Sequence, residues 1–307
     1  MRATQTHSKK CRQCIESHWA KGISDAVLDE VKRCFDEHSP VSETIHTAML
    51  RFFREYMCVG GMPYIVDRFL STNDMNIVLD EQRDILEEFK DDFGKHLDEN
   101  EKEETDITLL GRINRVFDSI PAQLAKENKK FIYAALEKKG RSENYQAAIQ
   151  WLYDAGIINI CYNLSNLSLP LEGNKLDNIF KIYMQDTGLF VAMLEEGSAG
   201  RILSGDLGMY KGAIYENIVA DAFSKSGRPL FYYHKDSGLE IDFITPIDNE
   251  VTLVEVKATN GNAKSANTVL KNKDQYGVNQ CIKLSANNVG QEGEKLTLPY
   301  YMVFLLG

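Results

Sequence analysis

The chain has 307 residues and a mass of 34.8 kDa, which at roughly 100–200 residues per domain suggests two domains or three small ones. Hydrophobic residues make up 43% and charged residues 26%, proportions that exclude fibrous and wholly disordered proteins. No apolar stretch approaches the roughly 18 residues of a transmembrane helix, and residues 1–10 lack a signal-peptide core, so we expect no membrane partner. Isolated cysteines in apolar surroundings indicate reduced thiols and a cytoplasmic location: Cys11, Cys14, Cys34, Cys58, Cys161 and Cys281.

The negative charge is concentrated in one segment. The formal net charge is −10, and residues 80–106 alone hold 13 acidic and 4 basic side chains, a net of −9. This segment is either a solvated helix face or an interaction surface. An acidic total counts against nucleic-acid binding, because phosphate contacts need Lys and Arg. Residues 201–307 are nearly balanced, with 11 basic and 12 acidic side chains, so a local basic groove remains compatible with the composition.

Residues 1–20 are predicted to be a poorly ordered polar leader. Within them lie two histidines and two cysteines that could form a tetrahedral zinc site: His7, Cys11, Cys14 and His18. The four fall within 12 residues, closer together than the ligand pairs of most structural zinc sites. The zinc site and the unstructured leader both remain open interpretations.

Residues 21–106 form a predicted helical region. Ser42 is a plausible N-cap, and apolar residues then recur at helical spacing: Ile45, Met49, Phe52, Phe53 and Tyr56. Gly60 and Gly61 supply a turn, and Pro63 begins a second helix that reaches about residue 70. A third helix is expected over residues 75–98, followed by a polar loop to residue 106.

Residues 107–200 are predicted to be a winged-helix-like region. We expect a helix over residues 107–117, a short second helix opened by Pro121, a third capped by Ser142, and a strand over residues 157–164. Residues 182–184 form a further short strand before a helix start. In a winged helix the third helix reads DNA, and its exposed residues here would be Glu143, Asn144, Gln146, Gln150 and Asp154. Only Lys138, Lys139 and Arg141, just before it, are basic, so a packing module between neighbouring domains is the alternative.

Residues 201–307 show an α/β order. Helices are expected over residues 211–226 and 263–276, and strands over residues 230–233, 239–245, 252–257, 281–284 and 300–306. Such alternation predicts a mixed sheet flanked by helices.

Four residues of this region could share one chemistry. Glu216 lies in the first helix, Asp242 in the second strand, and Glu255 and Lys257 in the third. Alternation along a strand places Glu255 and Lys257 on one side, and a hairpin would bring Asp242 beside Glu255. Carboxylate oxygens are ligands for Mg²⁺ or Mn²⁺, so Asp242, Glu255 and Glu216 are the expected metal ligands. Lys257 would orient water or stabilise charge on a phosphate, which is the logic of metal-dependent phosphodiester hydrolysis.

Each of these residues also has an ordinary structural interpretation. Glu255 and Lys257 could form a surface ion pair on an edge strand. Asp242 could be a turn carboxylate, and Glu216 could face solvent from its helix.

The ordered set of a helix glutamate, a strand aspartate and, thirteen residues on, Glu255-Val256-Lys257 resembles the PD-(D/E)xK, or restriction-endonuclease-like, superfamily. The resemblance implies that Asp242 and Glu255 bind metal, that Lys257 aids catalysis and that Glu216 supports them. Residues 20–307 also resemble the C-terminal region of prokaryotic AAA+-type ATP-binding proteins, through FREYMCVGGMP, the Ile120-Pro121 turn, YMQDTGL, GAIYE, EIDF and EVK. In that group a P-loop ATPase precedes a winged-helix-like piece and a nuclease-like domain.

This chain lacks a G-x-x-x-x-G-K-[ST] motif, so ATP binding is not expected. We interpret it as a relative that starts after the ATPase. The sequence therefore predicts a Mg²⁺-dependent nuclease, or a nuclease-like protein that binds DNA or RNA. The alternative is a non-catalytic interaction module that acts with a separate ATPase or another partner.

Overall fold

The computed structural model describes residues 23–94, 104–138, 140–258 and 263–306. The predicted leader and the possible zinc ligands His7, Cys11, Cys14 and His18 lie outside the described residues, as does Lys139.

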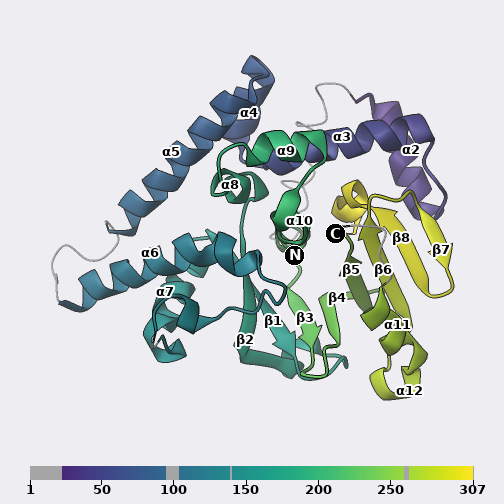
Figure 1. Cartoon of the computed structure of the whole chain (residues 1–307). Coiled ribbons are helices and arrows are strands. Elements are labelled where there is room, and N and C mark those ends of the chain that lie inside the picture. Colours follow the sequence, from purple (N-terminus) through teal and green to yellow (C-terminus); the bar gives the residue numbers. More distant parts are fainter. Residues whose placement is uncertain (1–22, 95–103, 139, 259–262, 307) are drawn as a thin grey trace, which may run out of the picture.

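The N-terminal region is helical, as predicted (Figure 1). Its helices are α2 (Asp25–Asp36), α3 (Glu43–Val59), α4 (Pro63–Thr72), α5 (Met75–Phe93), α6 (Glu104–Leu124) and α7 (Ser142–Asp154), with a 3-10 turn, η1 (Tyr133–Ala135). Ser42 is the N-cap residue of α3 but makes no side-chain capping bond. Pro63 is the first residue of α4, where its missing N–H costs nothing. None of the described helices is long and apolar enough to span a membrane.

The acidic segment lies largely on α5. Its apolar residues Val78, Leu86 and Phe93 are buried, whereas the described acidic side chains point mostly to solvent. Exposed carboxylates occupy the outer side of the helix: Asp80, Asp84, Glu87, Glu88, Asp91 and Asp92. The described part of this segment therefore forms an exposed acidic helix face, which agrees with both a solvated face and an interaction surface.

Two predicted helix starts are wrong. Pro121 does not open a second helix, because α6 continues through it and ends at Leu124. A proline so close to a helix end disturbs few backbone bonds, and the Pro121 carbonyl still accepts from the Ala125 amide at 3.0 Å. At the next helix, the N-cap position belongs to Arg141 and Ser142 is the first helical residue.

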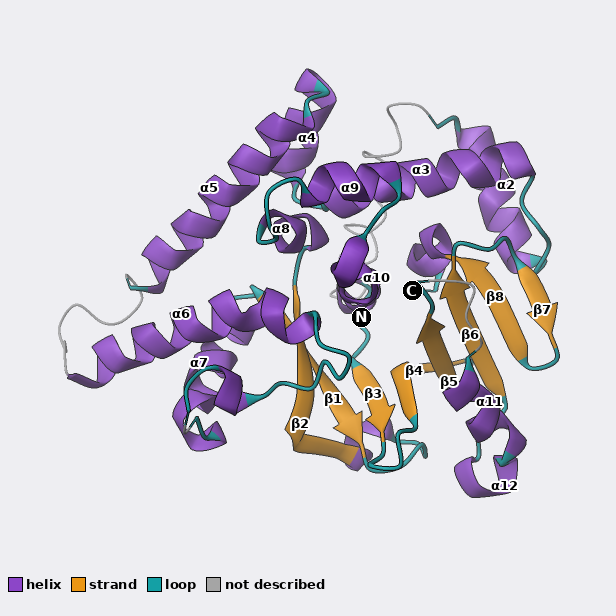
Figure 2. Ribbon diagram, viewed as in Figure 1, coloured by secondary structure: helices purple, strands orange, loops and turns teal. Residues whose placement is uncertain are grey.

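Eight strands form one mixed sheet in the order β2-β1-β3-β4-β5-β6-β8-β7 (Figure 2). Their bounds are β1 (Ile158–Leu164), β2 (Lys175–Met184), β3 (Phe231–His234), β4 (Glu240–Ile247), β5 (Glu250–Val256), β6 (Gln280–Ser285), β7 (Gly290–Glu292) and β8 (Lys295–Pro299). The pairs β1/β3, β5/β6 and β6/β8 are parallel, and the others are antiparallel. Because β1 pairs with β3, the sheet runs across the boundary expected between residues 200 and 201.

Helices cover both faces of the sheet. The remaining elements are α8 (Thr187–Ala192), α9 (Ser198–Ser204), α10 (Lys211–Lys225), α11 (Lys264–Lys271) and α12 (Lys273–Tyr276), with 3-10 turns η2 (Leu171–Asn174), η3 (Gly208–Tyr210) and η4 (Tyr300–Leu305). Phe243, Val254 and Val256 belong to the main hydrophobic cluster, which includes α10. Leu253 instead joins a second cluster with Ala266 and Val269 of α11. Alternate residues of β5 therefore enter two different cores.

The strand predicted over residues 300–306 is not formed there. Residues 300–305 form the 3-10 turn η4, and the missing strands are β7 and β8, just before it. The run Tyr300-Tyr301-Met302-Val303 is fully buried, and an apolar run without alternation does not distinguish a strand from a buried helical turn.

Two glycines allow the segments 53–63 and 183–189 to pack closely against each other. Gly60 has φ +75°, and the Gly61 amide donates to Oδ2 of Asp186 at 2.7 Å. The other oxygen of Asp186 accepts from the Leu189 amide at 3.0 Å and caps α8. A side chain at Gly60 would collide with this carboxylate, since an added Cβ would lie 2.1 Å from Oδ1. The contact fixes the α3–α4 corner against α8.

Candidate functional site

The β4–β5 hairpin brings Asp242 to the end of β5. Phe243 pairs with Val254, so Asp242 and Glu255 are the next residues outward on the two strands. The register between β3 and β4 shifts between Phe231 and Tyr233, so β4 has one extra residue here, an irregularity typical of a β-bulge. The Val256 amide donates to Oδ2 of Asp242 at 2.8 Å, which fixes the carboxylate beside the end of β5.

Lys257 joins the two predicted metal ligands. Its Nζ lies 3.9 Å from Oδ2 of Asp242 and also contacts Oε2 of Glu255. Glu255 is buried, whereas the side chains of Asp242 and Lys257 are 13% and 27% exposed to solvent. The structure thus brings Asp242, Glu255 and Lys257 together. Because Glu255 is buried, the interpretation of a surface ion pair is wrong for it.

Glu216 is directed toward a different set of partners. It is buried on α10, so the interpretation as a solvent-facing helix residue is wrong. Its Oε1 lies 2.9 Å from Nζ of Lys129, and its Oε2 lies 3.5 Å from Nζ of Lys181. The hydroxyl of Tyr183 donates to the same Oε2 at 2.8 Å. Two ammonium groups therefore balance this carboxylate.

The carboxylates approach from different sides of the sheet. Val254 and Val256 pack in the cluster that includes α10, so alternation directs Glu255 toward the α11 side, whereas Glu216 comes from α10. Across the described ranges, no group of three or more His, Cys, Asp or Glu is placed to hold a metal ion. Asp242 and Glu255 remain a fitting pair of hard donors, because neither Glu255 oxygen has a hydrogen-bond partner of regular geometry among the described residues.

Three partners of the site were missed from the sequence: Lys129, Lys181 and Glu240. Lys181 has no solvent exposure, and its Nζ lies 2.8 Å from Oε1 of Glu240. Its ammonium also lies 4.7 Å from the ring centroid of Tyr232. The signal was a single lysine inside the otherwise apolar run Ile179-Phe180-Lys181-Ile182-Tyr183, since a lysine in a buried strand needs a partner.

Burial and neighbouring charges shift the pKa values of these carboxyl groups in opposite directions. Burial, followed by the charges of Glu216 and Glu255, raises the pKa of Asp242 to about 7. Burial also raises the pKa of Glu255, although Lys257 opposes it. For Glu216, the effect of burial is outweighed by Lys181 and Lys129, which hold its pKa at about 2. Glu216 therefore stays ionised near neutral pH, whereas Asp242 and Glu255 hold their protons to a higher pH than ordinary carboxyl groups.

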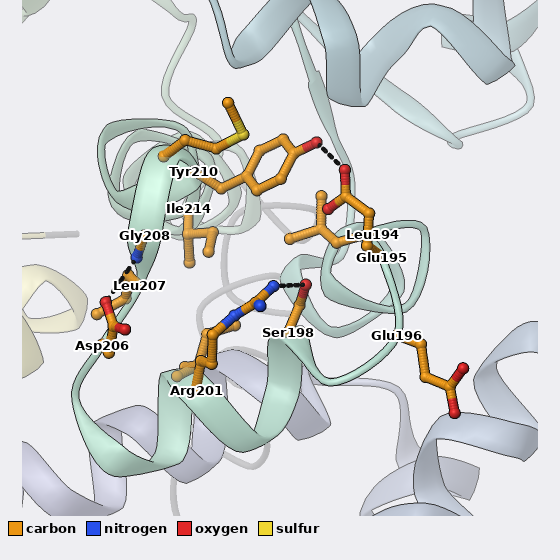
Figure 3. A pocket seen from close by; sticks show the side chains of 12 residues that line it. Leu194, Glu195, Glu196, Ser198, Arg201, Asp206, Leu207, Gly208, Tyr210 and Ile214 are labelled. Carbon is orange, nitrogen blue, oxygen red and sulfur yellow. Dashed lines mark hydrogen bonds between the residues drawn. The ribbon is translucent and has the colours of Figure 1, made fainter.

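A separate pocket of about 470 Å³ is lined by residues of α9, η3 and α10 and by the segment that follows α8 (Figure 3). Its polar side chains largely satisfy one another. Tyr210 donates to Oε1 of Glu195 at 2.8 Å, and Arg201 donates to the hydroxyl of Ser198 at 3.1 Å. None of Glu216, Asp242, Glu255 and Lys257 lines it, so it is distinct from the carboxylate–lysine site.

Two domain families match parts of the chain. Residues 50–199 match a domain of unknown function, DUF8612, and residues 211–301 match a second domain of unknown function, DUF4143. The second domain is often found at the C-terminus of AAA-type ATPases and here contains all four predicted site residues. No curated protein and no solved structure matches the chain.

Proposed function

We propose that this protein is a divalent-metal-dependent phosphodiesterase that acts on nucleic acid. Its active-site residues would be Asp242, Glu255 and Lys257. The observation that carries the proposal is the contact of Lys257 with both carboxylates at the end of β5. The order α10, β3, β4, β5, α11 and β6 supports a restriction-endonuclease-like fold for this part of the chain. The DUF4143 match supports a relation to the C-terminal domains of AAA-type ATPases.

A cation would resolve an electrostatic conflict at Asp242. Its pKa is raised by burial and by two neighbouring carboxylates, so the ionised form lies in an unfavourable negative potential. Asp242 and Glu255 are the residues that would hold Mg²⁺ or Mn²⁺. When bound, such an ion would acidify a water molecule and neutralise a phosphate oxygen. Glu216 has a supporting role, since its charge favours a cation at Asp242 while its own oxygens are engaged by lysines.

The other side chains orient and balance this pair. The Val256 amide holds one oxygen of Asp242 in place. Burial alone would lower the pKa of Lys257, but Asp242 and Glu255 raise it, so the side chain stays an ammonium ion near neutral pH. A permanent cation suits the stabilisation of charge on a phosphate better than the removal of a proton from water. Its 27% exposure leaves it accessible to a substrate.

Cleavage of labelled DNA and RNA tests the proposal. Wild-type protein should cleave in Mg²⁺ or Mn²⁺ and not in EDTA, and Asp242→Asn and Lys257→Met should each reduce the rate roughly 100-fold or more. Glu250→Gln is the matched control, because Glu250 is an exposed carboxylate at the other end of β5. Equal cleavage by wild type and Asp242→Asn, or no cleavage by wild type, would contradict the enzyme proposal.

A non-catalytic interaction module is the second candidate. The observation that favours it is the internal charge balance, in which Lys129 and Lys181 neutralise Glu216 and Glu240 without any metal. In that case the exposed acidic side of α5 would contact a basic surface of a separate ATPase or another protein. Retention of partner binding by Asp242→Asn, together with loss on replacing Glu87 and Glu88 by Gln, would support this candidate.

The winged-helix interpretation of residues 107–200 stays a prediction. Helices α6 and α7 precede the antiparallel strands β1 and β2, but α6 continues through Pro121, so among the described residues two α-helices and the 3-10 turn η1 stand where three helices were expected. Here β1 also pairs with β3, so the hairpin is part of the central sheet. A cytoplasmic location is likewise proposed, supported by free and buried thiols at Cys34, Cys58, Cys161 and Cys281.

A further inference from the structure

A second concave site lies between α7 and the strands β1 and β2. It is a pocket of about 410 Å³, larger than a single nucleobase, and it does not include any residue of the carboxylate–lysine site. Apolar side chains from both strands and from α7 line it, together with several amides. The residues that carry the proposed recognition are Tyr133, Tyr162, Phe180, Gln146, Gln150 and Asn178, and the exposed carboxylate Asp177 also lines the pocket.

Aromatic rings form one wall of this pocket. Phe180 is buried, with its ring centroid 6.0 Å from that of Tyr162 and 6.3 Å from that of Tyr133. Both tyrosine rings are steeply inclined to Phe180, at 63° and 83°, and both are only half-buried. Partly exposed, firmly packed aromatic rings are platforms on which a planar heteroaromatic ligand can stack.

Amide side chains form the rim. Gln146 and Asn178 are exposed, and within the described part of the chain their amides have no hydrogen-bond partner. Gln150 donates to Asp154 at 2.8 Å, which leaves its carbonyl oxygen available. Each amide both donates and accepts, so together they match the alternating donors and acceptors on the edge of an unpaired base.

Positive charge lies next to the aromatic wall. The ammonium of Lys175 is 4.7 Å from the ring centroid of Tyr162, and the exposed Arg141 immediately precedes α7. Lys175 is also paired with Glu172 and with Asp177, which lines the pocket, so these three side chains carry a net charge of −1. Such a site favours recognition of the base over recognition of its phosphates, and suits a stiff, highly charged duplex poorly.

We infer that this pocket binds an unpaired nucleobase, supplied by a single-stranded nucleic acid or a free nucleotide. The inference extends the proposed function by naming unpaired strands as the ligand, but binding does not depend on cleavage. Tyr162 aligns with Phe231 in the β1–β3 register, and Phe231 packs in the cluster beneath α11. The pocket therefore lies on the side of the sheet toward which Glu255 is directed.

Fluorescence anisotropy with labelled oligo(dT) and oligo(dA), measured in EDTA, tests this inference separately from catalysis. Tyr162→Leu should weaken binding about tenfold or more and Gln146→Ala several-fold, with a duplex of the same length binding more weakly than either single strand. Tyr153→Leu is the matched control, because Tyr153 is an exposed tyrosine of α7 that does not line the pocket. Thermal melting of each variant checks that it is folded.

Competition with AMP identifies the source of the base. Binding of oligo(dA) that AMP displaces only weakly or not at all supports base recognition on a polymer, and binding of AMP at least as tight as that of oligo(dA) assigns the pocket to free nucleotides. Equal affinity of wild type, Tyr162→Leu and Gln146→Ala for single strands, or no binding of either ligand by wild type, would overturn the inference. Asp242→Asn should bind as wild type does, so loss of cleavage and loss of base binding are distinguishable.

Discussion

The ammonium of Lys181, which is fully buried, lies 3.5 Å from Oε2 of Glu216 and links the helix carboxylate to the sheet. Replacement by Met would leave Glu216 with only Lys129 and Glu240 without its cation. We expect Lys181→Met to lower the free energy of unfolding by about 3–5 kcal/mol, measured by urea denaturation, because removing one member of a buried pair strands the other charge.

Lys273→Met is the comparison for this change. Lys273 pairs with Glu294, but its side chain is 43% exposed, and exposed pairs contribute at most about 1 kcal/mol. Equal stability of the Lys181→Met and Lys273→Met proteins would show that the buried cluster is not the stabilising network described above.

Asp242 should make stability fall as the pH rises. Its folded-state pKa of about 7 lies above the ordinary value of 3.8, so between these pH values the folded protein holds a proton that the unfolded chain has released, and the stability falls with rising pH until both states are ionised. In EDTA, the free energy of unfolding of Asp242→Asn should rise relative to that of wild type between about pH 4 and pH 7. Above pH 7 the difference should stay constant, on the order of a few kcal/mol. Urea denaturation of both proteins across this range measures the difference. A constant difference at all pH values would contradict the raised pKa.

Gly60→Ala should destabilise the α3–α4 corner. The change adds a Cβ at φ +75° and places it against Asp186, which must move away from the Gly61 amide. We expect a loss of about 2–4 kcal/mol, from the strained backbone and the broken capping contact together. Gly156→Ala is the comparison, since Gly156 also has a positive φ, +70°, but nothing lies within 4 Å of an added Cβ, and this change should cost about 1–2 kcal/mol. Equal losses, compared by thermal denaturation, would remove the proposed role of Asp186.

The contact among Asp242, Glu255 and Lys257 was predictable because it depends on local rules. Strand alternation and a short hairpin connect residues that lie within a few positions of one another in the β4–β5 register. The neutralisation of Glu216 was not predictable in this way. Lys181 reaches it only because β2 pairs with β1 and β1 pairs with β3, and no periodicity in the sequence specifies which distant strands become neighbours.

The errors in the fold have a related cause. Residues 300–305 are apolar at nearly every position, so their sequence has no periodicity that could distinguish a strand from a buried helical turn. Strand β8 has alternating Leu296 and Leu298 but only five residues, and its neighbour β7 has three. Pro121 was expected to begin a helix, a position that proline favours, but it also fits the last turn of α6.

Calorimetric titration of Mn²⁺ into metal-free protein at pH 7.5 tests the central proposal most directly, because it measures the site without requiring a substrate. The account predicts a binding site in wild type that is retained in Glu250→Gln, lost in Asp242→Asn and strongly weakened in Glu255→Gln. Unchanged Mn²⁺ binding by Asp242→Asn, or no binding by wild type, would contradict a divalent-cation site formed by these carboxylates.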